Sequence, residues 1–461
     1  MARRGLLTLA LFAVVASCGA DEVSSAPARP TTWHVEGGAI RDAEGRTLIM
    51  RGVNFAGAHK QKPYLSSFTR DDMVKLRTEY GFNSLRFLVI WAGVEPEKGV
   101  FDETYLAGVE ERIVWAKEAG LLVVLDMHQD LYGEGFLGGD GAPRWTCDAS
   151  RYAAYEPTTP WFLGYLDQNV AACVDGLYVE DGEVRAHFIE AWRKLAERLK
   201  KHDNVLGFDI LNEPPWGTYN ILAFEEDKLA PFYEAVVKGV REVAPDWLVF
   251  AEPSGARNVG YATRLPKLSF GNVVYAPHAY DNEAESGNGF DETRREPLVR
   301  KLAELRADAD AIDAALYIGE YGGQAEHPGI VPYMDAQFDG AGAVAASSAY
   351  WAFDKSDGYA LLKPDGSEKK ELADALSRPY PSRVAGKLLS YAFDDHAKVA
   401  TFEYEPDRAI AAPTEIIIPP RVYPAGLTVE CGGCSVDELP GLVRLKTAPP
   451  GDRVSVTIRA R

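Results

Sequence analysis

Two stretches of this chain carry a glutamate at the end of an apolar run. Residues 205–215 read VLGFDILNEPP, and residues 315–323 read ALYIGEYGG. Each run resembles a buried strand that ends at a carboxylate, Glu213 or Glu320, with a pair of turn-forming residues close behind. The carboxyl ends of the strands of a (β/α)8 barrel carry its active site, and several strands contribute catalytic groups. The two stretches therefore predict such a barrel, with two carboxylates at its mouth.

Six further apolar runs resemble these two, and amphipathic helical patterns such as residues 71–80 and 187–201 lie between them. Continuous apolar strands that alternate with helices indicate a parallel sheet covered on both faces, and eight units fit a (β/α)8 TIM barrel. A doubly wound sheet is the alternative, but no glycine-rich phosphate loop follows the first run. The eight runs are residues 48–55, 84–91, 121–128, 205–212, 248–253, 272–280, 315–321 and 342–354.

The sequence changes character after about residue 383. Six short β-rich segments, separated by turn residues, follow between residues 387 and 460. They predict a small C-terminal antiparallel β-sandwich. We therefore divide the chain into a signal segment (1–18), a flexible tether (19–32), a barrel domain (33–383) and a β-sandwich domain (384–461).

The first residues have the features of a secretory signal. Arg3 and Arg4 precede the apolar stretch GLLTLALFAVVAS, which is too short to span a membrane stably. Cys18 follows directly and resembles the lipidated cysteine of a bacterial lipobox, although an ordinary signal with an incidental cysteine is the alternative. We expect an exported protein, either secreted or tethered to a membrane through Cys18.

Charge and cysteine content narrow the possibilities further. The formal net charge is −19, which argues against a nucleic-acid partner. Without Cys18, four cysteines remain, and an even number in an exported chain favours disulfides. Local pairing predicts Cys147–Cys173 and Cys431–Cys434. We expect a monomer without cofactor or metal.

One insertion, residues 131–181, is long for a connection within a barrel. Long insertions on the active face of a barrel are often functional. The insertion predicts either a groove for an apolar ligand or a subdomain whose aromatic residues form their own core. Its aromatic residues are Tyr132, Phe136, Trp145, Tyr152, Tyr155, Trp161, Phe162, Tyr165 and Tyr178.

Polar and aromatic side chains stand at the ends of the other runs, where apolar residues would otherwise be expected. A buried Arg or His costs several kcal/mol unless it is paired, so these groups predict a shared polar site. His128 lies between Asp126 and Asp130, a pattern compatible with metal ligation, but no other group of metal spacing joins it. The candidate site residues beside the two glutamates are Arg86, Asp126, His128, Asn212, His278, Tyr280 and Trp351.

This layout suits glycoside hydrolysis. Glu213 would protonate the leaving oxygen and must therefore carry a proton, whereas Glu320 would attack the anomeric carbon and must be ionised. Arg86 and Tyr280 are suited to hold Glu320 ionised, and Asn212 to bind the sugar 2-hydroxyl. Trp351 offers a flat face for a sugar ring, or else packs in the core. Glu252 also ends a run, and we interpret it as structural.

The motifs LRF, the third-run His128, NEP, HAY, GEYG and the late Trp351, in this order, resemble glycoside hydrolase family five, over about residues 48–354. This resemblance implies a retaining mechanism with Glu213 as acid/base and Glu320 as nucleophile. The longer stretches RGVNFAGAHK, DMHQDLYGEGF and YWAFDKSDGYAL resemble the endoglycoceramidases, which cut between the glycan and the ceramide of glycosphingolipids. That resemblance places Lys60, Asp126, Asn212, Tyr280 and Trp351 against substrate, with Lys62 as an alternative to Lys60.

Two other functions stay open at this point. A different β-glycosidase of the same family, such as an endo-β-glucanase or a glucosyl- or galactosylceramidase, would share the two glutamates. A carbohydrate-binding protein without activity is a more distant alternative, because both carboxylates and their surroundings are present.

Overall fold

A computed structural model describes residues 32–447 and 451–461 of the chain. The expected signal segment with Cys18, and the tether up to residue 31, lie outside these residues and stay predictions. No helix in the described part of the chain is long and apolar enough to cross a membrane.

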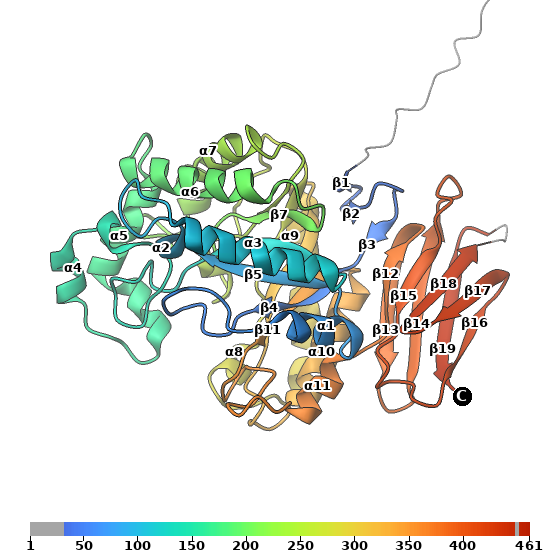
Figure 1. Cartoon of the computed structure of the whole chain (residues 1–461). Helices are drawn as coiled ribbons and strands as arrows, with labels where there is room; N and C mark the ends of the chain where they lie inside the picture. The colour runs from blue at the N-terminus through green and yellow to red at the C-terminus, as the bar shows by residue number, and fades with distance from the viewer. Residues whose placement is uncertain (1–31, 448–450) are drawn as a thin grey trace, which may run out of the picture.

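Eight parallel strands close into a barrel, which confirms the predicted fold (Figure 1). Their side chains are almost all buried because the barrel interior fills one face and the helices cover the other. The order around the barrel follows the chain, with β11 closing against β4. The strands are β4 (Arg51–Phe55), β5 (Ser84–Ile90), β6 (Leu122–His128), β7 (Val205–Asp209), β8 (Leu248–Ala251), β9 (Val273–Tyr275), β10 (Ala315–Tyr321) and β11 (Ser347–Phe353).

Helices surround the barrel and lay an apolar face on it. In α6 (Glu183–Leu199), the buried residues Phe188, Trp192, Leu195 and Leu199 recur at helical spacing. In α3 (Glu103–Glu118), the preceding Asp102 caps the first turn, because its side chain accepts from two backbone amides. Between β8 and β9 the chain forms only the 3-10 turn η4 (Gly255–Arg257). The main helices are α1 (Arg70–Thr78), α3 (Glu103–Glu118), α6 (Glu183–Leu199), α7 (Ala230–Arg241), α9 (Arg295–Ala311), α10 (Ile330–Ala343) and α11 (Lys370–Leu376).

The insertion after β6 is a compact helical subdomain. It contains the 3-10 helices η1 (Arg144–Thr146) and η2 (Trp161–Leu166), and the α-helices α4 (Ala149–Ala154) and α5 (Gln168–Tyr178). The predicted disulfide Cys147–Cys173 is present and joins η1's end to α5. Phe136 contacts the rings of Tyr152 and Tyr155, so part of the aromatic set forms the subdomain's own core.

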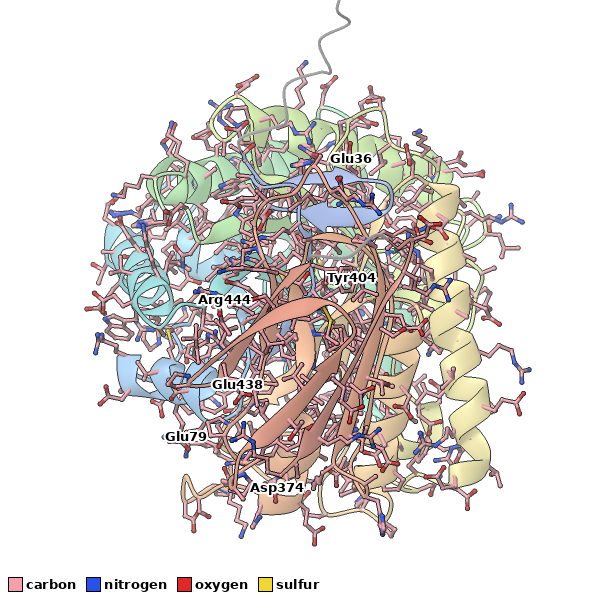
Figure 2. The ribbon with its side chains drawn as sticks, turned by 90° about the vertical axis from the view of Figure 1, so that its right-hand side faces the viewer. Glu36, Glu79, Asp374, Tyr404, Glu438 and Arg444 are labelled. Carbon is pink, nitrogen blue, oxygen red and sulfur yellow. A yellow bond between two sulfur atoms is a disulfide. The ribbon has the colours of Figure 1, made fainter. Side chains whose placement is uncertain are left out.

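The C-terminal strands form two antiparallel sheets beside the barrel, and Figure 2 looks onto them, with Glu438 and Arg444 labelled on two strands. The predicted bond Cys431–Cys434 joins two of these strands. One sheet contains β13 (Gly386–Asp394), β14 (Val399–Pro406), β19 (Val454–Ala460) and β16 (Leu427–Cys431). The other contains β1 (His34–Glu36), β2 (Ala39–Arg41), β3 (Thr47–Leu48), β12 (Tyr380–Val384), β15 (Thr414–Ile417), β18 (Leu442–Thr447) and β17 (Cys434–Leu439).

The larger sheet crosses the boundary that we placed at residue 383. It takes β1 to β3 from the start of the described chain, and β12 pairs with both β3 and β15. The short edge strand β17 is missing from our sequence prediction, because its CSVDEL sequence is mostly exposed and carries almost no apolar pattern. The barrel domain and the sandwich therefore share one sheet and do not separate at a single point.

The barrel and the sandwich meet at the end of α10. Phe338 of α10 packs edge-on against Tyr391 of β13, with ring centroids 5.2 Å apart. Gly342 lies in the same helix, where a Cβ atom would overlap the backbone carbonyl of Tyr391. The close approach of α10 to β13 therefore requires glycine at this position.

We expect Gly342→Ala to lower the free energy of unfolding by about 1–3 kcal/mol, the usual cost of overpacking a rigid contact. Thermal unfolding followed by circular dichroism measures the effect. Gly271→Ala is the matched control, because a Cβ there meets nothing within 4 Å. Equal melting temperatures for wild type and Gly342→Ala would contradict the proposed close contact.

Candidate active site

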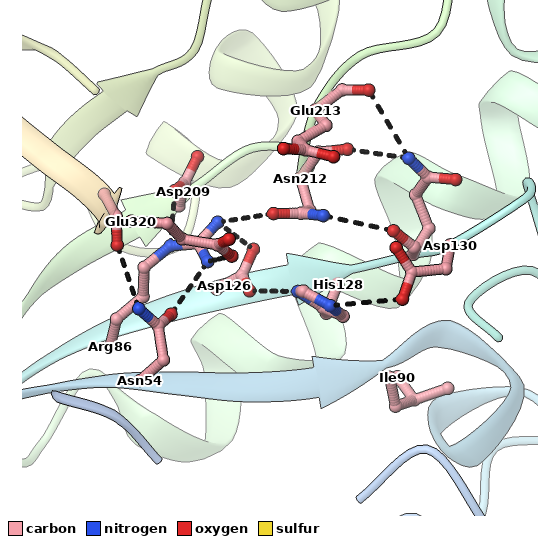
Figure 3. Close-up of polar contacts among 12 residues, drawn as sticks. Asn54, Arg86, Ile90, Asp126, His128, Asp130, Asp209, Asn212, Glu213 and Glu320 are labelled. Atoms are coloured by element: carbon pink, nitrogen blue, oxygen red, sulfur yellow. Dashed lines mark hydrogen bonds and ion pairs between the residues drawn. The ribbon is translucent and has the colours of Figure 1, made fainter. Parts of the chain in front are cut away.

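The polar residues singled out in the sequence converge at the carboxyl ends of the barrel strands. Figure 3 shows six of them: Arg86, Asp126, His128, Asn212, Glu213 and Glu320. Some lie within strands and others just beyond them. Arg86 is the third residue of β5 and so lies inside the barrel, not at the strand end that the sequence suggested. Asp126 and His128 belong to β6, Glu320 to β10 and Trp351 to β11, while Asn212, Glu213, His278 and Tyr280 follow β7 and β9.

Arg86 is the centre of the polar network. Its side chain is fully buried, and its three nitrogens all point to oxygen atoms. Four carboxylates surround this one guanidinium, so its charge is compensated more than once. Nη1 lies 2.9 Å from Asn54 Oδ1 and 2.8 Å from Glu320 Oε1; Nη2 lies 3.0 Å from Asn212 Oδ1, 2.8 Å from Glu252 Oε1 and 2.9 Å from Asp126 Oδ1; Nε lies 3.0 Å from Asp209 Oδ2.

Two donors hold the carboxylate of Glu320. Arg86 donates to Oε1, and the Tyr280 hydroxyl donates to Oε2 at 2.8 Å. Burial raises the pKa of Glu320 to about 7, against the positive charges of His278 and Arg86, which lower it. The sequence prediction that Arg86 and Tyr280 favour the ionised form agrees with these contacts. Burial works in the opposite direction, which the sequence did not reveal.

Glu213 is held by its backbone as well as its side chain. Its φ is +42°, a left-handed conformation, and its backbone N–H donates to Glu252 Oε2 at 2.9 Å. Oε1 lies 2.8 Å from His278 Nδ1 and accepts from Asn258 Nδ2 at 2.7 Å. The buried Glu252, which we interpreted as structural, thus fixes the turn that presents Glu213.

His278 lies between the two glutamates. A parallel bridge joins its backbone to Glu320, and its Nδ1 lies 3.5 Å from Glu320 Oε2. Its Nε2 is 3.2 Å from Glu252 Oε1. Burial alone would lower the pKa of His278, but the charges of Glu252 and Glu320 and the hydrogen bond to Glu213 raise it well above its usual value. The ring of His278 thus lies between three carboxylates, whose charges favour its protonated form.

The separation of the two glutamates decides what they can do together. A carboxylate oxygen of Glu213 and one of Glu320 lie within 4.8 Å of each other, and His278 is within the same distance of both. Retaining glycosidases place their carboxyl groups about 5–5.5 Å apart, whereas inverting ones need about 6.5–9.5 Å for a water molecule. The spacing in this barrel is that of a retaining pair.

One wall of the site is formed by three residues: His128, Trp351 and Lys60. The rings of His128 and Trp351 stack, with centroids 5.2 Å apart and 14° between the planes. His128 Nδ1 lies 2.8 Å from Asp126 Oδ2, and burial lowers the pKa of His128 well below its usual value, so this ring is neutral. Lys60 Nζ lies 5.1 Å from the centre of the Trp351 ring and pairs with Asp130.

The structure decides between the two neighbouring lysines. Lys60 points into the site, whereas the Lys62 side chain is 71% exposed and pairs with Glu134. Lys60 is therefore the lysine that can reach a ligand held against Trp351.

Three groups of side chains could each hold a metal ion by geometry. A protein cation already lies in or against each of them: Lys60, the His278 imidazolium or Arg86. The negative charge that would attract a metal is thus partly compensated by the chain itself. The groups are His128, Asp130 and Asp140; Glu213, His278 and Glu320; and Asp126, Asp209 and Glu252.

The sequence prediction missed several members of the network. Asn54 and Asp209 lie within the apolar runs of β4 and β7, where a polar residue in a buried strand was the available signal. Asp140 and Asn258 come from loops, and nothing in their local sequence distinguishes them. Only the folded chain brings these two residues to the site.

Comparisons with known proteins agree with this geometry. Residues 41–357 match the family model "Cellulase (glycosyl hydrolase family 5)", and residues 378–458 match the glycoside hydrolase family 5 C-terminal domain. Endoglycoceramidase I of Rhodococcus hoagii is 28% identical over 456 residues, which covers 94% of this chain and 89% of that protein. An endoglycoceramidase of Hydra vulgaris is 24% identical, over 87% of this chain and 81% of that protein.

Solved structures give the same result. Endo-glycoceramidase II from a Rhodococcus species, in complex with ganglioside GM3, is 30% identical, with a TM-score of 0.83 over 91% of this chain and 99% of that chain. Another structure of that protein, described as a lactosyl-enzyme intermediate, superposes with a TM-score of 0.81 over 94% of this chain and 100% of that chain, at 30% identity. The resemblance expected from the ordered motifs is confirmed: this chain belongs to glycoside hydrolase family 5.

Proposed function

We propose that this protein is an endoglycoceramidase, a retaining β-glycosidase that hydrolyses the bond between the oligosaccharide and the ceramide of a glycosphingolipid. One observation carries the proposal: the chain aligns over 91% of its length with an endo-glycoceramidase structure and covers 99% of it. The close spacing of Glu213 and Glu320 supports the retaining mechanism.

In this proposal Glu320 is the nucleophile. Arg86 and Tyr280 each donate to one of its oxygens, which fixes the carboxylate and favours its ionised form. Attack on the anomeric carbon forms a glycosyl-enzyme ester as the bond to the aglycone breaks. Glu213 gives its proton to the leaving oxygen, then takes a proton from the water that hydrolyses the ester.

The glycan would lie against the wall defined by Trp351, His128 and Lys60. Trp351 supplies an apolar face, and the neighbouring His128, Asp126 and Lys60 supply polar groups for hydroxyls. Asn212 directly precedes Glu213 in the chain, with its Oδ1 accepting from Arg86 and its Nδ2 donating to the Gln129 carbonyl at 3.1 Å. Both contacts orient Asn212 for the sugar 2-hydroxyl.

The insertion after β6 offers an apolar surface for the lipid. Besides its buried core, η2 exposes Trp161 at 48%, Phe162 at 42%, Leu163 at 41% and Leu166 at 65%. On the inner side of η2, the Tyr165 hydroxyl accepts from Leu131 N and lies 3.2 Å from Gln129 Oε1. Gln129 in turn donates to the Asn212 carbonyl at 2.9 Å, which connects η2 to the turn that presents Glu213.

The variant Glu320→Ser tests the proposed nucleophile. It should abolish hydrolysis but allow glycoside synthesis from an α-glycosyl fluoride, because the serine leaves space for the fluoride.

The variant Glu213→Ala tests the proposed acid/base. It should lower kcat for substrates with poor leaving groups by about 10²–10⁴-fold, the usual contribution of a general acid. Added azide should restore turnover of an activated aryl glycoside and give a β-glycosyl azide. Nuclear magnetic resonance of the wild-type product checks retention; an α-configured first product would refute the assignment.

The pH dependence follows from the raised pKa of Glu320, about 7. Because the ionised form attacks, kcat/KM should fall as the pH decreases through about 7. Tyr280→Phe removes a donor to this carboxylate, so it should shift the acid limb to higher pH and reduce kcat. Tyr423→Phe removes a hydroxyl in the sandwich and is the control. An unchanged acid limb in Tyr280→Phe would argue against Glu320 as the titrating nucleophile.

Incubation with a panel of glycosphingolipids and cello-oligosaccharides, with mass analysis of the products, separates an endoglycoceramidase from a β-glucanase or a glucosylceramidase.

The lipid-binding role of η2 is tested with matched substrates. The double variant Trp161→Ala/Phe162→Ala should lose about tenfold in kcat/KM on a ceramide glycoside, because two large apolar contacts are lost. An aryl glycoside of the same sugar should be affected little. Leu439→Ala, at an exposed leucine of the sandwich, is the control. Equal losses on both substrates would refute the role.

A further inference from the structure

A side chain from outside the strand ends contacts the proposed acid/base. Asn258 follows the 3-10 turn η4 (Gly255–Arg257) after β8, and its Nδ2 donates to Glu213 Oε1 at 2.7 Å. His278 Nδ1 lies 2.8 Å from the same oxygen. Two donors therefore converge on Oε1. Among the described residues, no hydrogen bond reaches the other oxygen, Oε2.

We infer that Asn258 is a positioning residue that assigns the catalytic proton of Glu213 to Oε2. The inference rests on the proposed role of Glu213 as acid/base. An oxygen that accepts from both an amide and an imidazolium cannot also carry a proton directed at either of them. When Glu213 is neutral, its proton must therefore be on Oε2, the oxygen that is free to face a leaving group.

This assignment has a consequence for each half of the reaction. In the first step, the O–H bond at Oε2 breaks and its proton goes to the glycosidic oxygen as that oxygen leaves the anomeric carbon. Glu213 then becomes a carboxylate, and the Asn258 donor favours this charged form. In the second step, Oε2 takes a proton from the attacking water, which restores the neutral acid. Asn258 remains a donor to Oε1 throughout.

The loop that carries Asn258 is anchored well enough to hold this geometry. The Gly255 N–H donates to the Pro214 carbonyl at 3.0 Å, so η4 is bound directly to the turn that contains Glu213. Arg257 pairs with Asp308 at 3.0 Å, and the Ser254 N–H donates to Glu225 Oε1 at 2.7 Å. A mispositioned catalytic group can cost about 100-fold in rate, so such anchoring is functionally meaningful.

The test compares substrates that need protonation with one that does not. Asn258→Leu keeps the size of the side chain but removes the donor. It should lower kcat/KM on an alkyl β-lactoside by about 10–100-fold, less than the full contribution of a general acid. Glycosylation by a dinitrophenyl β-lactoside, whose leaving group departs without protonation, should change less than about threefold.

The pH profile supplies a readout that a merely structural role would not change. The Asn258 donor favours the ionised carboxylate, so Asn258→Leu should move the basic limb of kcat/KM to higher pH. Asn258→Asp keeps the shape but places a like charge beside Glu213, so it should move this limb further in the same direction. Asn288→Leu is the control, because Asn288 makes an equivalent 2.8 Å bond to Glu283 on the exposed surface.

Equal losses on both lactosides with an unchanged basic limb, or no loss at all, would overturn the inference. If Asn258→Leu does not fold, as shown by its thermal unfolding, Asn258→Asp decides the question by the same two measurements. Azide rescue of Glu213→Ala is carried out in parallel. Its failure would refute the role of Glu213 itself, whereas successful rescue with a wild-type-like Asn258→Leu would refute only the positioning role.

Discussion

The buried guanidinium of Arg86 is the interaction on which the rest of the site depends. It lies inside the barrel with no solvent exposure and contacts residues from five other barrel strands or their ends. Removing such a charge from water costs several kcal/mol, so it is stable only where fixed partners surround it. The carboxylates and amides that compensate Arg86 are held in place by the same contacts. Glu320 and Asn212 are among them, which links the stability of the barrel mouth to its chemistry.

The site contains more carboxylates than cations, and this imbalance governs its protonation. Asp126, Asp209, Glu252, Glu320 and Glu213 lie around Arg86 and His278, so some protons must be retained near neutral pH. Burial raises the pKa of Asp126 to about 6, although Arg86 opposes the shift, and raises the pKa of Asp209 well above its usual value. The protonated His278 shares its charge between Glu213, Glu252 and Glu320. One imidazole ring thus contacts both Glu320, which must be ionised to attack, and Glu213, which gives up a proton in the first step and regains one in the second.

The loops and the sandwich complete what the barrel begins. The insertion after β6 has a buried core around Phe136, and its helix η2 exposes apolar side chains. The groove for an apolar ligand stays a prediction. Tyr165 and Gln129 connect η2 to the backbone at Asn212, so the exposed apolar helix and the turn that contains Glu213 share one hydrogen-bonded path. At the opposite end, β1 to β3 and β12 join the sandwich sheet, which fixes the start of the barrel against the C-terminal strands.

The sequence by itself determined the elements whose signals are local. Eight apolar runs alternating with helices gave the barrel, and polar residues within or after those runs marked Glu213, Glu320 and most of their neighbours, because a buried strand tolerates such residues only at a site. Short separation in the chain gave both disulfides. The sequence also left alternatives, such as Lys60 or Lys62, that only side-chain direction resolves.

Only the tertiary structure decided the features that depend on distant contacts. Asn258 and Asp140 reach the site through loop folding, and β3 pairs with the distant strand β12, where Leu48 lies opposite Arg383. Neither the two loop residues nor this strand pairing has a local signature in the sequence. The register between distant strands is fixed by the whole sheet. The protonation of Glu320 likewise depends on burial, which no neighbouring residue in the sequence reports. The chain thus encodes the type of each catalytic group locally, while its charge and position arise from the fold, because electrostatic energies depend on distance and solvent exposure.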